Sequence, residues 1–397
     1  SGLTLSTTAA DTSGVGSYAI SASGGTADNY TITHNNGTLS VTRRPVTVTA
    51  NANQSKIYGE DNPTYTYTAS TGSAGTGSGL VNGDTLTGTL NRVEGEIYDV
   101  RGYAISQGGL TNTNNANYDI SFVSTTFNIA KRPITVTATT NTKVYDGTTR
   151  SATLPTITSG TLANNSSLNI ADMVTLSQTY DTKDVGSVKT LTPRAVINTG
   201  NNNYAITYVE TTGEVTPKAL TIGAPTGITK TYDGSNAVTN ATLGTLSGFV
   251  GDETVTASVA SGTYGDKNAG SNKSVTVNYS LSDGTNGGKA SNYSLANTTG
   301  LSATIEKKAL SISGTTAAGK TYDGTTSASV TAGSLSGFVG SETVAVDTAG
   351  GTFSSKDAGS RTVTATYTLK DGTGGGLASN YSLANTTGLS ATIEKKA

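Results

Sequence analysis

The stretch IAKRPITV at residues 129–136 recurs along the chain with the same order of apolar, basic and β-branched residues. Its other copies are VTRRPVTV at 41–48, VTPKALTI at 215–222 and IEKKALSI at 305–312, and IEKKA at 393–397 begins one more. The basic residues Arg44, Arg132, Lys218, Lys308 and Lys396 are separated by 88, 86, 90 and 88 residues. A period near 88 residues is the size of one small domain, so the chain is a tandem array and not one large globule.

The boundaries of the repeats follow from this period. We predict a C-terminal half repeat at 1–42 and full repeats at 43–130, 131–216, 217–306 and 307–397, with the last running into the start of another. A Lys-x-Tyr turn and an Asn-Tyr pair recur once in each repeat. The stretch ASNYSLANTTGLSATIEKKA is identical at 290–309 and 378–397, which indicates a recent duplication.

Composition excludes several classes of protein. The net charge is −2 and 13% of residues are charged, so no basic stripe is available to follow nucleic-acid phosphates. No apolar run approaches 18 residues, so we expect no membrane insertion of this segment. The absence of cysteine excludes disulfides and thiolate metal sites. The one histidine, His34, has no evident nucleophile or orienting acid beside it, so we expect no enzyme activity.

Strand signals dominate each repeat. In residues 134–138, Ile-Thr-Val-Thr-Ala alternates apolar and polar side chains, which is typical of a half-buried strand. Further strands are expected near 151–157 and at 174–180, with a loop at 161–172 and a closing hairpin formed by 204–208 and 213–215. Short strands separated by regular turns predict an all-β array of immunoglobulin-like antiparallel β-sandwiches. A β-grasp fold, with a helix near Leu80–Asp84, is the alternative.

The motifs of each repeat resemble those of a known family. Residues 43–130 carry Tyr58-Gly59-Glu60-Asp61-Asn62-Pro63, then GLVNGDTL at 79–86 and Asn117-Tyr118-Asp119-Ile120, and resemble the MBG type of domain. Residues 131–394 resemble three YDG-type repeats. Such domains occur in filamentous-haemagglutinin-like bacterial adhesins exported by two-partner secretion. The resemblance implies a cell-surface or secreted location. It also implies that the parent protein binds partners such as host or matrix glycans or surface proteins. We expect the chain itself to be monomeric.

The Tyr turns are the most distinctive candidate site. In one interpretation Tyr58, Tyr145, Tyr232 and Tyr322 form a spaced row of sugar-stacking platforms, because tyrosine offers a flat apolar face and a polar tip. In the other, each Tyr fills the end of a sandwich and Asp-Gly makes a turn, with Gly147, Gly234 and Gly324 at positive φ. Exposure of the Tyr rings separates the two interpretations.

The turn aspartates Asp146, Asp233 and Asp323 offer hard oxygen atoms near the joints between repeats, where calcium would stiffen the array. No calcium-binding loop pattern surrounds them, so solvated turn formation is the alternative, and no other cofactor is expected. Together these features predict a structural stalk segment of an adhesin that extends a distal binding region for attachment or biofilm formation. The second hypothesis is that the repeats are themselves weak, multivalent lectin-like modules.

Overall fold

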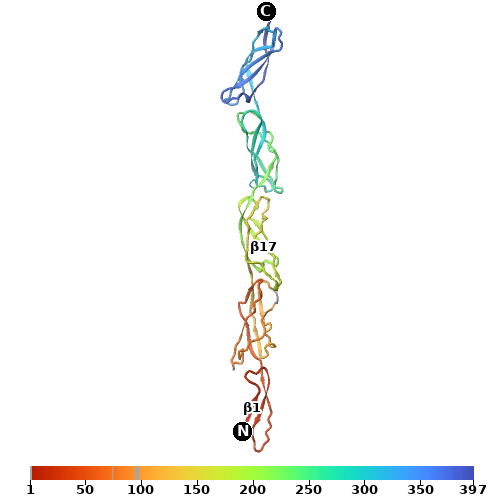
Figure 1. The fold of residues 1–397 in the computed structure, drawn as a ribbon, viewed down its shortest axis with the longest axis vertical. Helices are drawn as coiled ribbons and strands as arrows, with labels where there is room; N and C mark the ends of the chain where they lie inside the picture. Colours follow the sequence, from red (N-terminus) through yellow and green to blue (C-terminus); the bar gives the residue numbers. More distant parts are fainter. Residues whose placement is uncertain (1, 74, 94–97) are drawn as a thin grey trace. The chain divides into compact units, whose positions relative to one another are not determined.

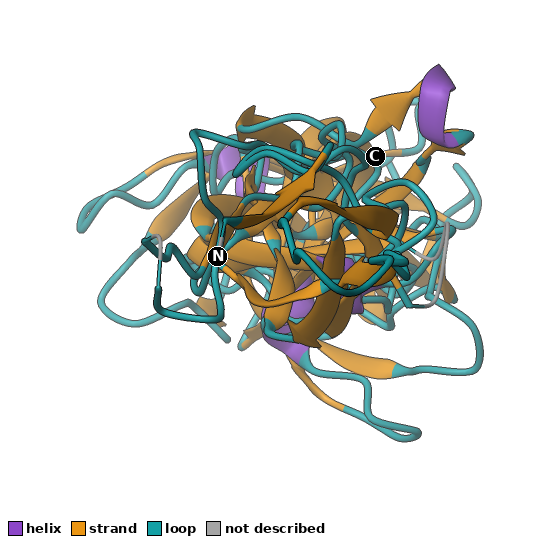
Figure 2. Cartoon of the chain, turned by 90° about the horizontal axis from the view of Figure 1, so that it is seen from below, coloured by secondary structure: helices purple, strands orange, loops and turns teal. Residues whose placement is uncertain are grey.

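The computed structural model describes residues 2–73, 75–93 and 98–397, and these residues form a succession of small β-sheets (Figure 1). The chain divides into two compact units, of which the first holds residues 1–141, 149–181 and 188–213, and the second holds the remainder. The first unit holds residues 1–42, repeat 43–130 and most of repeat 131–216, and the second holds the rest of that repeat and the two repeats that follow. The helical segments among the described residues are short 3-10 turns, purple in Figure 2. None of them is long and apolar enough to cross a bilayer.

The first unit begins with an antiparallel sheet of three strands, in the order β1-β2-β3. These strands are β1 (Leu3–Thr7), β2 (Gly16–Gly24) and β3 (Gly37–Val41). Repeat 43–130 follows with β4 (Arg44–Ala50), β5 (Ser55–Ile57), β6 (Tyr67–Ala69), β7 (Asn91–Arg92), β8 (Gly102–Ser106), β9 (Tyr118–Val123) and β10 (Thr126–Ala130). They form two sheets, β6-β4-β9 and β5-β10-β8-β7, as a β-sandwich requires.

Repeat 131–216 contributes residues to both units. Its elements are β11 (Arg132–Thr137), β12 (Thr142–Val144), β13 (Thr156–Ser159), β14 (Asn164–Asn165), η1 (Ser166–Leu168), β15 (Ile170–Ala171), β16 (Val174–Tyr180), β17 (Gly186–Ile197; labelled in Figure 1), η2 (Asn201–Asn203), β18 (Tyr204–Val209) and β19 (Thr211–Thr216). In the first unit β11 pairs with β13 and β18, and β16 pairs with β17. In the second, β12 pairs with the end of β19.

The second unit contains two complete repeats. The elements of repeat 217–306 are β20 (Lys218–Ile222), β21 (Lys230–Thr231), β22 (Leu246–Ser247), β23 (Val255–Tyr264), β24 (Gly270–Asp283), η3 (Ala290–Asn292), β25 (Tyr293–Leu295) and β26 (Thr298–Glu306). Those of repeat 307–397 are β27 (Lys308–Ser313), β28 (Thr316–Ala317), β29 (Lys320–Thr321), β30 (Ser327–Thr331), β31 (Ser334–Ser336), β32 (Val344–Phe353), β33 (Gly359–Asp371), η4 (Ala378–Asn380), β34 (Tyr381–Leu383) and β35 (Thr386–Glu394). Their sheets are β22-β20-β25 with β21-β26-β24-β23, and β31-β27-β34 with β28-β30-β32-β33-β35-β29.

The fold is the all-β tandem sandwich array that the sequence predicts. Alternation sets the core: Val46, Val48 and Ala50 of β4 are at most 2% exposed, while the threonines between them face solvent. Residues 80–84 contain turns and a bridge instead of a helix, which removes the β-grasp alternative.

Two details of the prediction from sequence were wrong. The expected closing hairpin does not exist, because β18 pairs in parallel with β11 while β19 pairs with β12 in the other sheet. The long strand β17 was also missed. The loop expected at residues 161–172 holds β14, η1 and β15, so one helical turn is present there.

Candidate functional site: the joints between repeats

Successive repeats follow one another without a flexible linker. One residue separates β10 from β11, β19 from β20, and β26 from β27. The hydrophobic core also crosses the joints: one buried cluster joins Tyr58 to Ala163 and Tyr204, and another joins Tyr232 to Val344 and Tyr381. The joints are therefore packed interfaces, and they gather most of the residues that the sequence singled out.

The tyrosine of each Lys-x-Tyr turn, here called the turn tyrosine, reaches into the following repeat. Tyr58, Tyr145 and Tyr232 are 3%, 1% and 1% exposed. Each ring meets edge-on the tyrosine of the next repeat's Asn-Tyr pair, here called the strand tyrosine. The centroid distances are 5.7 Å to Tyr204, 5.6 Å to Tyr293 and 5.6 Å to Tyr381. Such edge-to-face pairs are favourable beyond the area that they bury.

A carboxylate of the following repeat, here called the joint carboxylate, accepts hydrogen bonds from the hydroxyls of both tyrosines. Tyr145 donates to Glu253 at 2.7 Å and Tyr293 donates at 2.8 Å. Tyr232 and Tyr381 donate to Glu342 at 2.7 and 2.6 Å. In the earlier joint the acceptor is Asp172, which lies 2.5 Å from the Tyr204 hydroxyl and 3.4 Å from that of Tyr58.

The surroundings of Glu253 keep it ionised although it is 8% exposed. Burial opposes its ionisation, but hydrogen bonds from Lys183, Tyr145 and Tyr293 outweigh burial and hold the pKa of Glu253 below its ordinary value. The Lys183 ammonium lies 2.7 Å from Glu253, and its own pKa is raised by that contact. Burial, followed by the hydrogen bond to Glu342, raises the pKa of Tyr232 to about 12. The joint thus stabilises a neutral phenol against a charged carboxylate.

The asparagine of each Asn-Tyr pair ties down a loop of the preceding repeat. Asn292 is 0% exposed; its side-chain oxygen accepts from Val185 N–H at 2.9 Å, and its amide donates to Asp184 at 2.8 Å. Asn203 and Asn380 make the corresponding contacts with Val100 and Asp99, and with Ala269 and Asn268. These loops precede β8, β17 and β24, each of which is an inner strand of its sheet.

The turn glycines allow the repeats to approach closely. Gly147 and Gly234 have φ of +78° and +81°, and a Cβ on either would lie 2.8 Å from a methyl carbon of Val250 or Val339 in the next repeat. Gly324 has the same φ as Gly234, but a Cβ there would meet nothing within 4 Å. We call the three joints that contain a buried turn tyrosine (Tyr58, Tyr145 or Tyr232) the filled joints. In these joints glycine is required both by the positive φ of the turn and by the close approach of the next repeat.

The burial of the turn tyrosines corrects the sugar-stacking interpretation. Tyr58, Tyr145 and Tyr232 present no ring face to solvent, so they offer no platform for a pyranose. Tyr322, which no following repeat covers in this chain, is 37% exposed. The other three tyrosines fill the end of a sandwich, as the second interpretation proposed, and the sandwich that each one enters is that of the neighbouring repeat.

Each turn aspartate, a candidate calcium ligand in the sequence, forms an ion pair with a lysine. Asp146 accepts from Lys143 Nζ at 2.7 Å, and Asp233 and Asp323 accept from Lys230 and Lys320 at the same distance. Each also accepts the backbone N–H two residues further on. Hydrogen bonds from these lysines lower the pKa of all three aspartates, against burial at Asp146 and Asp233. Within the described ranges, no three acidic or histidine side chains gather as a metal site would need.

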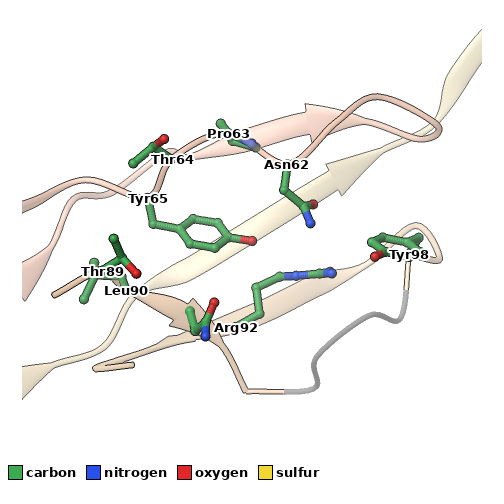
Figure 3. Close-up of a pocket in the computed structure, with 9 residues that line it drawn as sticks. Asn62, Pro63, Thr64, Tyr65, Thr89, Leu90, Arg92 and Tyr98 are labelled. Carbon is green, nitrogen blue, oxygen red and sulfur yellow. The ribbon is translucent and has the colours of Figure 1, made fainter. Parts of the chain in front are cut away.

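A separate cavity lies within repeat 43–130, lined by residues 62–65 and 89–92 and by Tyr98 (Figure 3). Arg92 stacks between two aromatic rings, 5.3 Å from Tyr98 and 4.7 Å from Tyr103, and Lys56 lies 4.8 Å from Tyr98. Burial, followed by the charge of Arg92, lowers the pKa of Lys56 to about 8. The Tyr65 hydroxyl is buried without a hydrogen-bond partner among the described residues. None of the residues predicted as sites lines this cavity.

Sequence reasoning missed the joint carboxylates. It singled out the turn tyrosines and noted that the Asn-Tyr pairs recur, but Glu253 and Glu342 lie in polar GDETV and GSETV segments that read as solvated turns. The recurrence of Glu-Thr-Val with the period of the array was the available signal.

Comparisons with known proteins find repeated domains of two types in this chain. A family model described as the YDG domain matches residues 130–212, 216–300 and 306–388, and one described as the MBG domain (YGX type) matches 1–40 and 46–128. A search of curated proteins found no match.

Solved structures give weak similarities over the whole chain. Sidekick-1 immunoglobulin domains 1–5 match at 9% identity and a TM-score of 0.20, covering 96% of this chain and 86% of that one. The N-terminal eight Ig domains of DSCAM match at 10% and 0.16, covering 89% and 57%, and domains 4–9 of surface layer protein SbsC match at 12% and 0.15, covering 87% and 65%. Scores this low bear on neither arrangement nor function.

Proposed function

Because the chain belongs to the family of proteins built from YDG domains, whose model matches well over half of its length, we propose that it is a non-enzymatic stalk segment of an extracellular adhesin. In this proposal the parent protein is a large bacterial surface or secreted protein of the filamentous-haemagglutinin-like type. The stalk extends a distal region that binds host or matrix glycans or surface proteins. Attachment or biofilm formation is the biological outcome.

The filled joint is the observation that supports a stalk. In each of the three filled joints a turn tyrosine at most 3% exposed lies within hydrogen-bond distance of a carboxylate in the next repeat. Bending at such a joint would bring an aromatic ring into water and separate a carboxylate from its donors, and both changes are unfavourable. At each of these three joints one residue separates the last strand of one repeat from the first strand of the next, so the connection there is short.

Small-angle X-ray scattering of the 397-residue chain tests this function. Repeats of about 35 Å each, placed end to end, would give a maximum dimension on the order of 150 Å. We expect that value both with and without a calcium chelator, because lysines already hold the turn aspartates. A compact particle, or one that extends only with calcium, would refute the self-stiffened stalk.

A joint variant makes the test specific. Tyr145→Ala combined with Glu253→Ala removes one joint's ring and its acceptor, and we expect a broader distribution of interatomic distances than in the parent chain. Tyr30→Ala is the matched control, because Tyr30 is 81% exposed. Identical scattering from the joint variant and the control would show that the joints do not stiffen the array. Saturable binding of surface polysaccharide by the parent chain, lost in Tyr322→Ala, would favour the lectin-like alternative.

A further inference from the structure

The cavity in repeat 43–130 contains a buried hydroxyl group that makes no hydrogen bond. Its volume is about 470 Å³, within the range of pockets that bind small molecules. The Tyr65 ring meets buried Phe127 edge-on at 5.1 Å, and its hydroxyl is directed toward Asn62 and Arg92 (Figure 3). Among the described residues this is the one buried side-chain polar atom without a partner. A buried donor without an acceptor is unfavourable, so the hydroxyl calls for an explanation.

Arg92 brings a buried positive charge to the same place. Its side chain is 7% exposed. Burial raises the pKa of Tyr65, and the nearby charge of Arg92 opposes that rise. Tyr98 and Tyr103 lie against the guanidinium at 5.3 and 4.7 Å. Stacking covers the faces of a guanidinium and leaves its N–H groups in the plane, where a carboxylate can accept two of them at once.

A second buried cation shares the Tyr98 ring. Lys56 Nζ lies 4.8 Å from the ring centroid, and the side chain is 6% exposed. Burial, followed by the charge of Arg92, lowers the pKa of Lys56 to about 8. The carboxylates of Glu60 and Asp61 act in the opposite direction without offsetting it. An anion beside Arg92 would counter the repulsion between the two cations, so the cavity favours a negatively charged occupant.

The rest of the lining suits a ring that carries hydroxyl groups. The cavity is also lined by exposed side chains that bear an amide or a hydroxyl: Asn62, Thr64, Thr89 and Asn91. Such groups both donate hydrogen bonds to sugar hydroxyls and accept them. Pro63 adds an apolar surface against which the C–H groups of a sugar can pack.

We propose that this cavity binds a uronic acid or a similarly acidic sugar, whose carboxylate accepts hydrogen bonds from the Tyr65 hydroxyl and the Arg92 guanidinium. The hydroxyls of the sugar meet the amide and hydroxyl side chains of the lining. A site of this kind goes beyond the proposed stalk. It is also separate from the turn tyrosines on which the lectin-like hypothesis was based.

Titration of methyl β-D-glucuronoside into the 397-residue chain tests the site, with ligand-observed NMR or calorimetry as the measurement. A ligand of about 14 non-hydrogen atoms should bind with Kd on the order of 1 mM. Methyl β-D-glucoside has a hydroxymethyl group in place of the carboxylate, so it should bind at least about tenfold more weakly. N-acetylglutamate α-amide, a model of an acidic peptide, should also bind at least about tenfold more weakly, because it brings no ring hydroxyls to the lining.

A pair of tyrosine variants locates the binding. Tyr65→Phe removes the unpartnered hydroxyl and keeps the ring against Phe127, so the fold should lose no stability. The same variant should weaken glucuronoside binding about tenfold or more, because the carboxylate loses a donor. Tyr67→Phe is the matched control, since Tyr67 is a half-buried tyrosine of the same repeat that does not line the cavity.

Several results would contradict the proposal. Absence of saturable glucuronoside binding, equal binding of the glucoside, or equal effects of the two variants would each overturn it. Binding of the glutamate amide as tight as that of the glucuronoside would assign the cavity to acidic peptides and overturn the saccharide. Tyr65→Phe leaves the filled joints intact, so none of these results would alter the scattering expected from the stalk.

Discussion

Replacing Tyr145 by phenylalanine removes one oxygen from the joint between repeats 131–216 and 217–306. That oxygen lies 2.7 and 3.0 Å from the two carboxylate oxygens of Glu253, and Tyr145 is 1% exposed. The phenylalanine ring keeps the edge-on contact with Tyr293 at 5.6 Å. Glu253 retains Tyr293 and Lys183 as donors. Loss of one hydrogen bond to a charged group should therefore weaken the joint by about 1.5–3 kcal/mol.

Hydrogen exchange across the joint measures this loss directly. The Val185 amide donates to Asn292 of the following repeat at 2.9 Å, so opening of the joint exposes it. A weakening of about 1.5–3 kcal/mol corresponds to roughly 10- to 150-fold faster exchange. Because tandem repeats couple mainly to their neighbours, amides of β33 in repeat 307–397 should exchange at their original rate.

The control and the contrary result are equally specific. Tyr30→Phe removes a hydroxyl from a side chain that is 81% exposed, and it should change no amide of the joint. If Val185 exchanged at the parent rate in Tyr145→Phe, the hydroxyl would contribute nothing to the joint. If exchange rose throughout the chain instead, the tyrosine would support the whole fold and not one interface.

Three further outcomes follow from the joints. Gly234→Ala should lower the free energy of unfolding, measured with denaturant, by about 1–3 kcal/mol more than Gly324→Ala does. Both glycines have φ of +81°, but only at Gly234 would a Cβ lie 2.8 Å from Val339. Equal losses of stability would show that the contact with Val339 does not matter. The pKa of Glu253 is lower in the folded chain than its ordinary 4.5, so its contribution is present above about pH 4.5 and is lost as pH falls through the folded value; acid titration of exchange at that joint should show loosening only below that point. The pKa of Tyr232 is raised to about 12 from 10, so its contribution is lost as pH rises between those values, and absorbance titration of the parent chain against Tyr232→Phe should find no ionisation of this phenol near pH 10.

Local signals predicted the parts of the fold that depend on neighbouring residues. The strand expected at 174–180 is β16 with the same bounds, because alternation of side chains encodes a half-buried strand directly. The order of strands in the sheets was less accessible. The short connection between β18 and β19 suggested a hairpin, yet β18 pairs in parallel with β11, whose partner residues lie about 70 positions away.

The candidate site was predicted in part for the same reason. A tyrosine beside a turn is visible in sequence, so Tyr145 and its equivalents were found. Its partner Glu253 is 108 residues distant, and a glutamate in a polar turn carries no mark of the burial that it acquires from the next repeat. Recurrence of Glu-Thr-Val marks the position of the carboxylate, but only contacts formed on folding show that it is buried.

The identical stretches at 290–309 and 378–397 have a genetic consequence. Each contains the Asn-Tyr pair that contacts the preceding repeat, and the first stretch ends at the second residue of β27. Unequal crossing-over between them would add or delete one whole repeat and would leave each turn tyrosine opposite a matching acceptor. Arrays of different lengths can therefore arise in one step, without an intermediate that exposes a mismatched interface to selection.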